Sequence, residues 1–122
     1  MDEEGNPREL NVDRALDVID FEPPKANTCE RRLLDDGPSK RYEGARCDKF
    51  VVEILELAGA LDDAPPADRF AILNVVAGDV VLESGGVETE LPLGTTALIP
   101  AAMPPYTLSS SGAATLLRSY VP

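Results

Sequence analysis

The stretch from Phe70 to Pro122 decides the fold of this 122-residue chain. It reads, in order, FAILNVVAG, DVVLESGG, VETELPLG, TTALIPAAMPP, YTLSSSG and AATLLRSYVP. Each segment has the length of a strand, is rich in Val, Ile, Leu or Thr, and is bounded by turn residues. Gly85-Gly86 predicts a tight hairpin, because a two-residue primed turn needs positive φ values that glycine adopts without steric cost. We therefore expect an all-β sandwich or barrel.

Before this stretch the pattern predicts one helix and one strong strand. Apolar residues from Val12 to Ile19 recur at i, i+3, i+4 and i+7, which is typical of one helix face, and Asn11 is a suitable N-cap. The segment Phe50–Leu57 (FVVEILEL) predicts a strand. Residues 25–49 are polar and interrupted by glycine and proline, so we expect an extended, loop-rich segment there. Residues 58–68 are expected to form a polar connection.

Composition limits the function. With 11 basic and 22 acidic residues the formal net charge is −11, which argues against a nucleic-acid surface, since phosphate binding depends on Lys and Arg. No apolar run is long enough to span a bilayer, and the charged N-terminus does not resemble a signal peptide. We expect a cytoplasmic protein with one domain and no membrane partner. Cys29 and Cys47 lack the spacing of a zinc or redox motif and are expected to be reduced.

Few residues are candidates for chemistry. The chain has no histidine, which excludes the usual catalytic triads and the commonest zinc ligand from it. No glycine-rich nucleotide motif is present. The paired acids Asp35-Asp36 and Asp62-Asp63 are expected to be solvated, and Arg31-Arg32 to form exposed ion pairs. Arg8 lies between a predicted turn and a helix cap, where its planar guanidinium can reach an anion or form a helix-entry ion pair.

Several stretches resemble one family. DEEGNPRELNVDRALDVIDFEP is similar to the segment that precedes the C-terminal cupin of short bacterial class I mannose-6-phosphate isomerases. CDKFVVEILEL resembles the entry strand of that cupin, FAILNVVAGDVVLESGG its central hairpin, and LPLGTTALIPAAMPPYTLSSSGAATLLRSYVP its closing strands. Together these segments cover nearly the whole chain in the family's order.

The resemblance implies a fold and an activity. It implies an all-β, cupin-like jelly roll with one short N-terminal helix, in which residues 1–49 form the helix and a connecting segment and residues 50–122 form the jelly roll. It implies membership of a zinc-dependent enzyme of carbohydrate metabolism that interconverts mannose 6-phosphate and fructose 6-phosphate. In that family the Gln, His and Glu ligands of zinc lie in a preceding cupin, so this chain is expected to bind neither metal nor cofactor itself. The implied partners are that upstream cupin and, through the full-length enzyme, a hexose phosphate.

The resemblance also assigns a site residue. Arg8 occupies the family's Arg-Glu-Leu position near the active-site mouth and is the catalytic residue carried over to this chain. The segment around Pro104, Pro105 and Tyr106 falls near where a metal-binding cupin has a late histidine. An alternative function is a free-standing, metal-free and non-catalytic cupin that binds a sugar or a protein partner, with an interior lined by Leu91, Ile99 and Tyr106.

Overall fold

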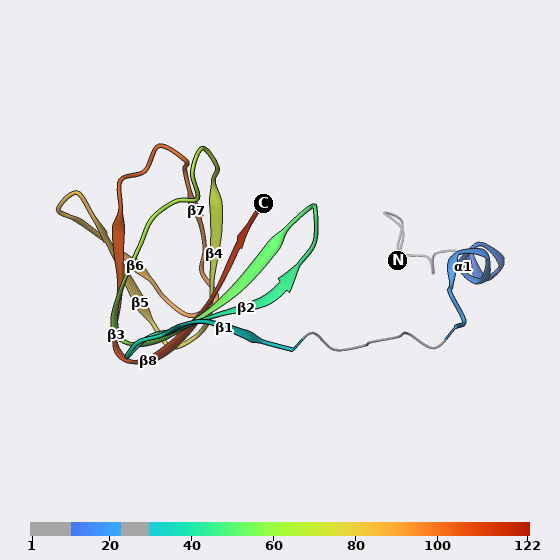
Figure 1. The fold of residues 1–122 in the computed structure, drawn as a ribbon, viewed down its shortest axis with the longest axis horizontal. Helices are drawn as coiled ribbons and strands as arrows, with labels where there is room; N and C mark the ends of the chain where they lie inside the picture. Colours follow the sequence, from blue (N-terminus) through green and yellow to red (C-terminus); the bar gives the residue numbers. More distant parts are fainter. Residues whose placement is uncertain (1–10, 23–29) are drawn as a thin grey trace, which may run out of the picture.

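The computed structural model describes residues 11–22 and 30–122, which form one short helix and eight antiparallel strands. The strands wind into a barrel-like double layer (Figure 1). The helix is α1 (Val12–Val18); the strands are β1 (Arg32–Asp36), β2 (Lys40–Arg46), β3 (Val51–Asp63), β4 (Ala71–Ala77), β5 (Val80–Ser84), β6 (Val87–Leu91), β7 (Thr96–Ile99) and β8 (Tyr106–Tyr120).

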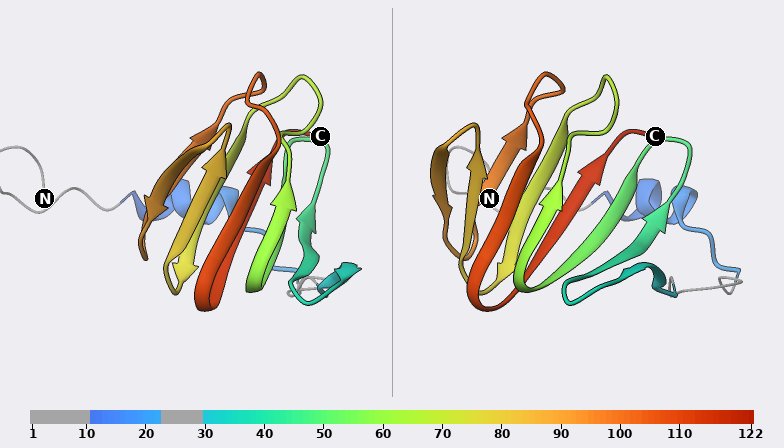
Figure 2. Two further views of the ribbon diagram at one scale, coloured as in Figure 1. Left: turned by 90° about the vertical axis from the view of Figure 1, so that its left-hand side faces the viewer. Right: turned by 60° about the vertical axis from the view of Figure 1, so that its left-hand side comes forward.

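Two long strands connect the layers. β8 pairs with β3 along almost its whole length, from Val51 opposite Tyr120 to Asp63 opposite Tyr106. The second half of β8 also pairs with β4, and its first half pairs with β5. Figure 2 shows β8, in orange to red, between β3 in green and β5 in yellow. One layer therefore has the order β1-β2-β3-β8-β4-β7, and the β5–β6 hairpin extends the other layer.

The core lies between these layers. Side chains of a strand alternate between its two faces, and in β3 every second residue from Val51 to Leu57 is buried. β8 follows the same rule, with Leu108 and Leu116 fully buried. Leu91, Ile99 and Tyr106, which the sequence predicted to line the interior, are all buried in the same cluster.

The turns at glycine agree with the sequence pattern. Gly85 and Gly86 both have positive φ values, of 59° and 80°, and they connect β5 to β6 as a two-residue hairpin. Gly78 is needed for a different reason. A Cβ atom there would lie 2.5 Å from the carbonyl oxygen of Ala113, so only glycine lets the β4–β5 turn approach β8 this closely.

Three expectations about the elements were wrong. The segment expected to be loop-rich contains β1 and β2, which pair with each other and with β3. The connection expected after Leu57 is instead the second half of β3, because a bulge at Gly59, with φ of 101°, lets the strand continue into the other layer. Ser39 stabilises that bulge, since its hydroxyl accepts from Ala58 N and donates to Ala60 O. The two expected segments on either side of Gly112 form the single strand β8.

The predicted helix is present as α1, with Asn11 at the N-cap position. None of its residues is buried. Within the described ranges, no helix has the length and apolar character needed to cross a membrane.

Candidate functional site

Arg8 and Cys29 both lie outside the described residues, so the role of Arg8 stays a prediction. Cys47 has an exposed, free thiol. Arg31 and Arg32 form exposed ion pairs with Glu56 and Glu43, as expected.

The described part of the barrel contains a buried cluster of charges at one end of the core. Glu53 of β3 and Arg118 of β8 are register partners, and both follow the inward-facing alternation of their strands. Arg118 Nη1 donates to Glu53 Oε2 over 2.9 Å, and both side chains are about 95% buried (5% and 6% exposed). Arg118 Nη2 donates to the carbonyl oxygen of Ala64 over 2.8 Å. The two strands therefore place an ion pair where a barrel normally has two apolar side chains.

A second carboxylate, Asp63, reaches the cluster from the far end of β3. Its Oδ2 lies 3.0 Å from Arg118 Nε, although that N–H does not point at the oxygen, so the contact is ionic rather than a hydrogen bond. Arg41 Nη2 donates to Asp63 Oδ1 over 2.9 Å, and Tyr106 OH donates to Asp63 Oδ2 over 2.6 Å. Arg41 Nη1 also lies 3.5 Å from Glu53 Oε2. Two guanidinium groups thus balance two carboxylates.

Tyrosine hydroxyls complete the cluster. Tyr120 OH donates to Glu53 Oε1 over 3.1 Å, and the ring of Tyr120 lies under the guanidinium of Arg118. Burial, followed by the hydrogen bond to Asp63, raises the pKa of Tyr106 well above its usual value. Burial and the negative charge of Glu53 likewise raise the pKa of Tyr120. Both hydroxyls therefore remain proton donors at neutral pH.

The pKa of Arg118 is raised as well. Burial by itself lowers it, but the attractions of Asp63 and Glu53 outweigh that effect. Arg118 therefore stays charged and, together with Arg41, neutralises the two carboxylates.

The donor set of this interior does not fit a metal ion. Zinc in proteins takes three or four ligands from Cys, His, Asp and Glu, whereas the cluster offers two carboxylates that already bind arginines. Within residues 11–22 and 30–122 no group of three such side chains comes together. Tyr106, in the segment that falls near the late histidine of metal-binding cupins, donates to Asp63.

The sequence did not indicate this cluster. Asp63 was expected to be solvated, as part of an acidic pair, but its side chain is only 5% exposed because β3 continues past Gly59 and Asp63 keeps the inward-facing alternation of Glu53. Arg118 contacts both carboxylates and donates to the carbonyl oxygen of Ala64, so it is not available to an anion. One signal was present, since Glu53 and Arg118 each occupy an inward position of an alternating strand.

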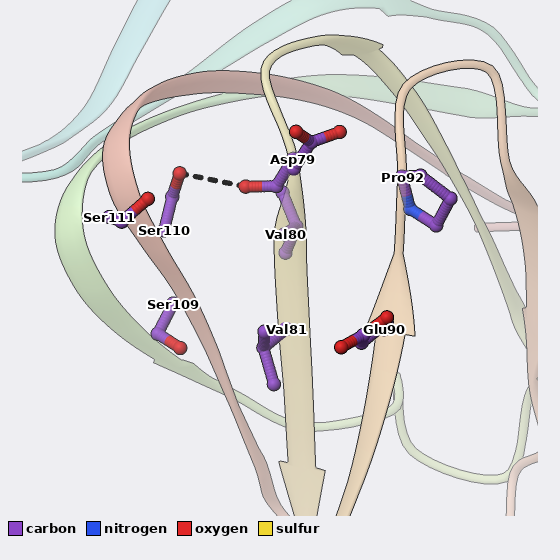
Figure 3. A pocket seen from close by; sticks show the side chains of 8 residues that line it. All are labelled: Asp79, Val80, Val81, Glu90, Pro92, Ser109, Ser110 and Ser111. Carbon is purple, nitrogen blue, oxygen red and sulfur yellow. Dashed lines mark hydrogen bonds between the residues drawn. The ribbon is translucent and has the colours of Figure 1, made fainter.

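A hollow of about 610 Å³ lies on the outside of the β8-β5-β6 layer (Figure 3). Three consecutive serines of β8 line it, which a regular strand cannot do because its side chains alternate. Here β8 leaves the register of β3 between Ser109 and Ala113, so Ser109, Ser110 and Ser111 all reach the same hollow. The remaining lining residues are Asp79, Val80, Val81, Glu90 and Pro92.

Hydrogen bonds connect the walls of this hollow, which we call the serine pocket. Ser110 Oγ donates to the carbonyl oxygen of Asp79 over 2.7 Å, and Leu93 N donates to Asp79 Oδ1 over 3.0 Å. The lining contains two carboxylates, three hydroxyls and no basic side chain. A phosphate group would be repelled there, whereas a neutral ligand with hydroxyl groups has donors and acceptors to bind.

A second hollow, of about 480 Å³, is almost entirely apolar. It lies between β6 and β7, which do not pair with each other in the described structure. Leu82, Leu91 and Ile99 form its floor, so it opens onto the core. No charged residue lines it, and a hexose phosphate does not fit such a surface.

Comparison with known proteins identifies the family of this domain. Residues 42–121 match the family model described as mannose-6-phosphate isomerase, cupin domain. The chain belongs to this family. No curated protein sequence matches this cupin domain.

Solved structures agree on the fold. Mannose 6-phosphate isomerase from Bacillus subtilis superposes with a TM-score of 0.77 at 22% identity, over 98% of this chain and 37% of that chain. An RmlC-like cupin from Shewanella frigidimarina has a TM-score of 0.62 at 15% identity, over 77% of this chain and 84% of that one. KdgF from Halomonas sp. has a TM-score of 0.61 at 15% identity, covering 74% and 86%. The all-β cupin jelly roll is confirmed, and this chain spans little more than a third of the Bacillus enzyme.

Proposed function

We propose that this cupin domain is the C-terminal part of a zinc-dependent mannose-6-phosphate isomerase that interconverts mannose 6-phosphate and fructose 6-phosphate. The supporting observation is the family match over residues 42–121, together with the superposition of nearly the whole chain on about a third of the Bacillus isomerase. We further propose that the domain is inactive alone and acts in the cytoplasm, where hexose phosphates are metabolised.

The buried charge cluster supports the inactive-alone part of the proposal. Isomerisation moves a proton between C1 and C2 of the open sugar and creates negative charge on the substrate oxygens. When bound, zinc polarises such oxygens. The described interior does not provide its ligands, since Arg118 and Arg41 neutralise both carboxylates. We place the zinc ligands of the complete enzyme in an upstream cupin, as the family resemblance implies.

Arg8 is the residue of this chain that we propose for catalysis. A guanidinium presents a planar fork of donors that matches a phosphate or a developing oxyanion. Arg8 is close in sequence to the helix that precedes the barrel, so it can reach an active site shared with an upstream domain. Neither the serine pocket nor the apolar hollow between β6 and β7 competes for the substrate, because neither has a basic side chain in its lining.

The serine pocket favours a second candidate function. A free-standing, metal-free cupin could bind an unphosphorylated sugar there, because Glu90 and Asp79 accept hydrogen bonds from hydroxyl groups and Pro92 offers an apolar surface to a sugar ring. This function needs no upstream domain and no Arg8.

Reading the gene upstream of Met1 is the experiment that separates these functions. An in-frame extension with histidine and glutamate zinc ligands, and isomerase activity of the full-length polypeptide but not of the 122-residue chain, would support the isomerase. An in-frame stop codon, together with chemical-shift changes at Ser109–Ser111 on titration with mannose, would support the sugar-binding cupin.

A further inference from the structure

Helix α1 presents an apolar stripe that nothing in the described structure covers. Val12, Leu16 and Ile19 are 56%, 50% and 48% exposed, and together with Ala15 they border one shallow hollow. They lie within about 100° of one another around the helix axis, since each residue advances by roughly 100°. None of the seven residues of α1 is buried.

A helix of this length does not form stably by itself. Isolated helices shorter than about 12–15 residues are marginal in water, and helices in proteins gain their stability chiefly from packing an apolar face. The other face of α1 carries Asp13, Arg14 and Asp17, which suit solvent. The stripe is therefore the face that packs against a partner.

We propose that the apolar stripe of α1 docks into an apolar groove on the upstream part of a longer isomerase polypeptide. This inference rests on the proposed function and identifies the surface that joins the two parts. The Bacillus isomerase superposes on 98% of this chain, helix region included, while only 37% of that enzyme is matched. The groove that receives α1 therefore belongs to the larger part of the polypeptide, which has no counterpart in this chain.

Docking of α1 also has a consequence for Arg8. Arg8 precedes Val12 by four residues, so a docked helix fixes the chain on which Arg8 is carried. The same contact that buries the stripe then positions the guanidinium at the edge of the upstream active site. In this proposal α1 positions Arg8 for catalysis.

The test compares Leu16→Asp with Val18→Asp in the full-length polypeptide. Both substitutions place an acid on α1 in exchange for an exposed apolar residue, but Val18 lies off the stripe and is 82% exposed. We expect Leu16→Asp to increase the hydrogen-exchange rates of the α1 amides by at least about tenfold and to open the segment to proteolysis, and Val18→Asp to change those rates by less than about twofold. Equal effects of the two variants in the full-length polypeptide would overturn the proposal.

Measurements on the 122-residue chain alone test two other partners that could cover the apolar stripe of α1. If Leu16→Asp lowers its melting temperature, α1 packs on its own barrel, and if Leu16→Asp converts a dimer of this chain into a monomer, a second copy covers the stripe. Either result overturns docking to an upstream part. Hydrogen-exchange rates do not depend on catalytic turnover, so the docking surface and the reaction are tested separately. If the full-length polypeptide has no isomerase activity but only Leu16→Asp exposes α1, the proposed reaction is refuted and the docking surface is supported.

Discussion

Replacing Arg118 by methionine tests whether the buried charge cluster holds the two layers of the barrel together. Methionine has a comparable length and fills much of the same space, so the change removes the charge more than the volume. It deletes the donor to Glu53 at 2.9 Å, the ionic contact with Asp63 at 3.0 Å and the donor to Ala64 at 2.8 Å. Arg41 then remains as the one cation that the described structure places beside both carboxylates.

The expected cost follows from burial. Removing one partner of a buried ion pair leaves an uncompensated charge and typically costs about 3–5 kcal/mol. Domains of this size are stable by only about 5–15 kcal/mol in total. For a chain of this length 1 kcal/mol corresponds to roughly 3–5 °C, so Arg118→Met should lower the melting temperature by roughly 10–20 °C.

Thermal and urea unfolding followed by circular dichroism provide the assay. The matched control is Arg32→Met, since Arg32 is 67% exposed and pairs with Glu43 at 3.2 Å. That variant should lose less than about 1 kcal/mol. A loss below about 1 kcal/mol for Arg118→Met as well would show that the cluster contributes nothing beyond a surface pair, and the reasoning would be refuted.

A double variant isolates the charge effect. Arg118→Met with Glu53→Met removes one cation and one anion together and leaves Asp63 with Arg41 and Tyr106. Because a buried pair replaced by apolar groups is often neutral in stability, the double variant should be more stable than Arg118→Met alone. An additive loss would point to packing rather than to charge.

Three further predictions concern pH, backbone and catalysis. Burial and its hydrogen bond raise the pKa of Tyr106 in the folded state, so its contribution to stability is complete below the ordinary tyrosine pKa and declines above it. The urea midpoint of the wild-type protein should therefore decrease as the pH rises above about 10, and the midpoint of Tyr106→Phe should decrease less steeply. An unchanged slope in that variant would assign the loss to other groups. Gly78→Ala, which forces a Cβ to within 2.5 Å of Ala113 O, should destabilise the protein by clearly more than Gly85→Ala, where the space is open and the left-handed backbone alone costs roughly 1–2 kcal/mol; equal urea midpoints would contradict this. Arg8→Ala in the full-length enzyme should lower kcat at least about 100-fold with a shift in melting temperature of less than about 2 °C, and wild-type turnover would remove Arg8 from the site.

The strands of the second half of the chain could be predicted because their signals are local. Short β-branched segments between glycines and prolines indicate strands wherever they occur, and Gly85-Gly86 determines its own turn. β1 and β2 gave no such signal, because charged residues and a glycine interrupt their apolar residues and none of their residues is buried. Their pairing with β3 is what makes them strands.

The charge cluster could not be predicted because its members are far apart in sequence. Glu53 and Arg118 are 65 residues apart, and only the register of β3 and β8 brings them together. Asp63 joins them because β3 continues through residues 58–63, a segment whose polar residues had predicted a connection. The family resemblance indicated the fold correctly, but it said nothing of an arginine held inside the barrel.

The position of β8 has a consequence for how this protein is made. β8 is the last strand of the chain and the shared neighbour of β3, β4 and β5. During synthesis each of those three strands therefore emerges from the ribosome with one hydrogen-bonding edge unpaired. These edges stay unpaired until residues 106–120 have been synthesised. We expect nascent chains that stop before Tyr106 to remain bound to chaperones, and the barrel to close in a single step once β8 has emerged.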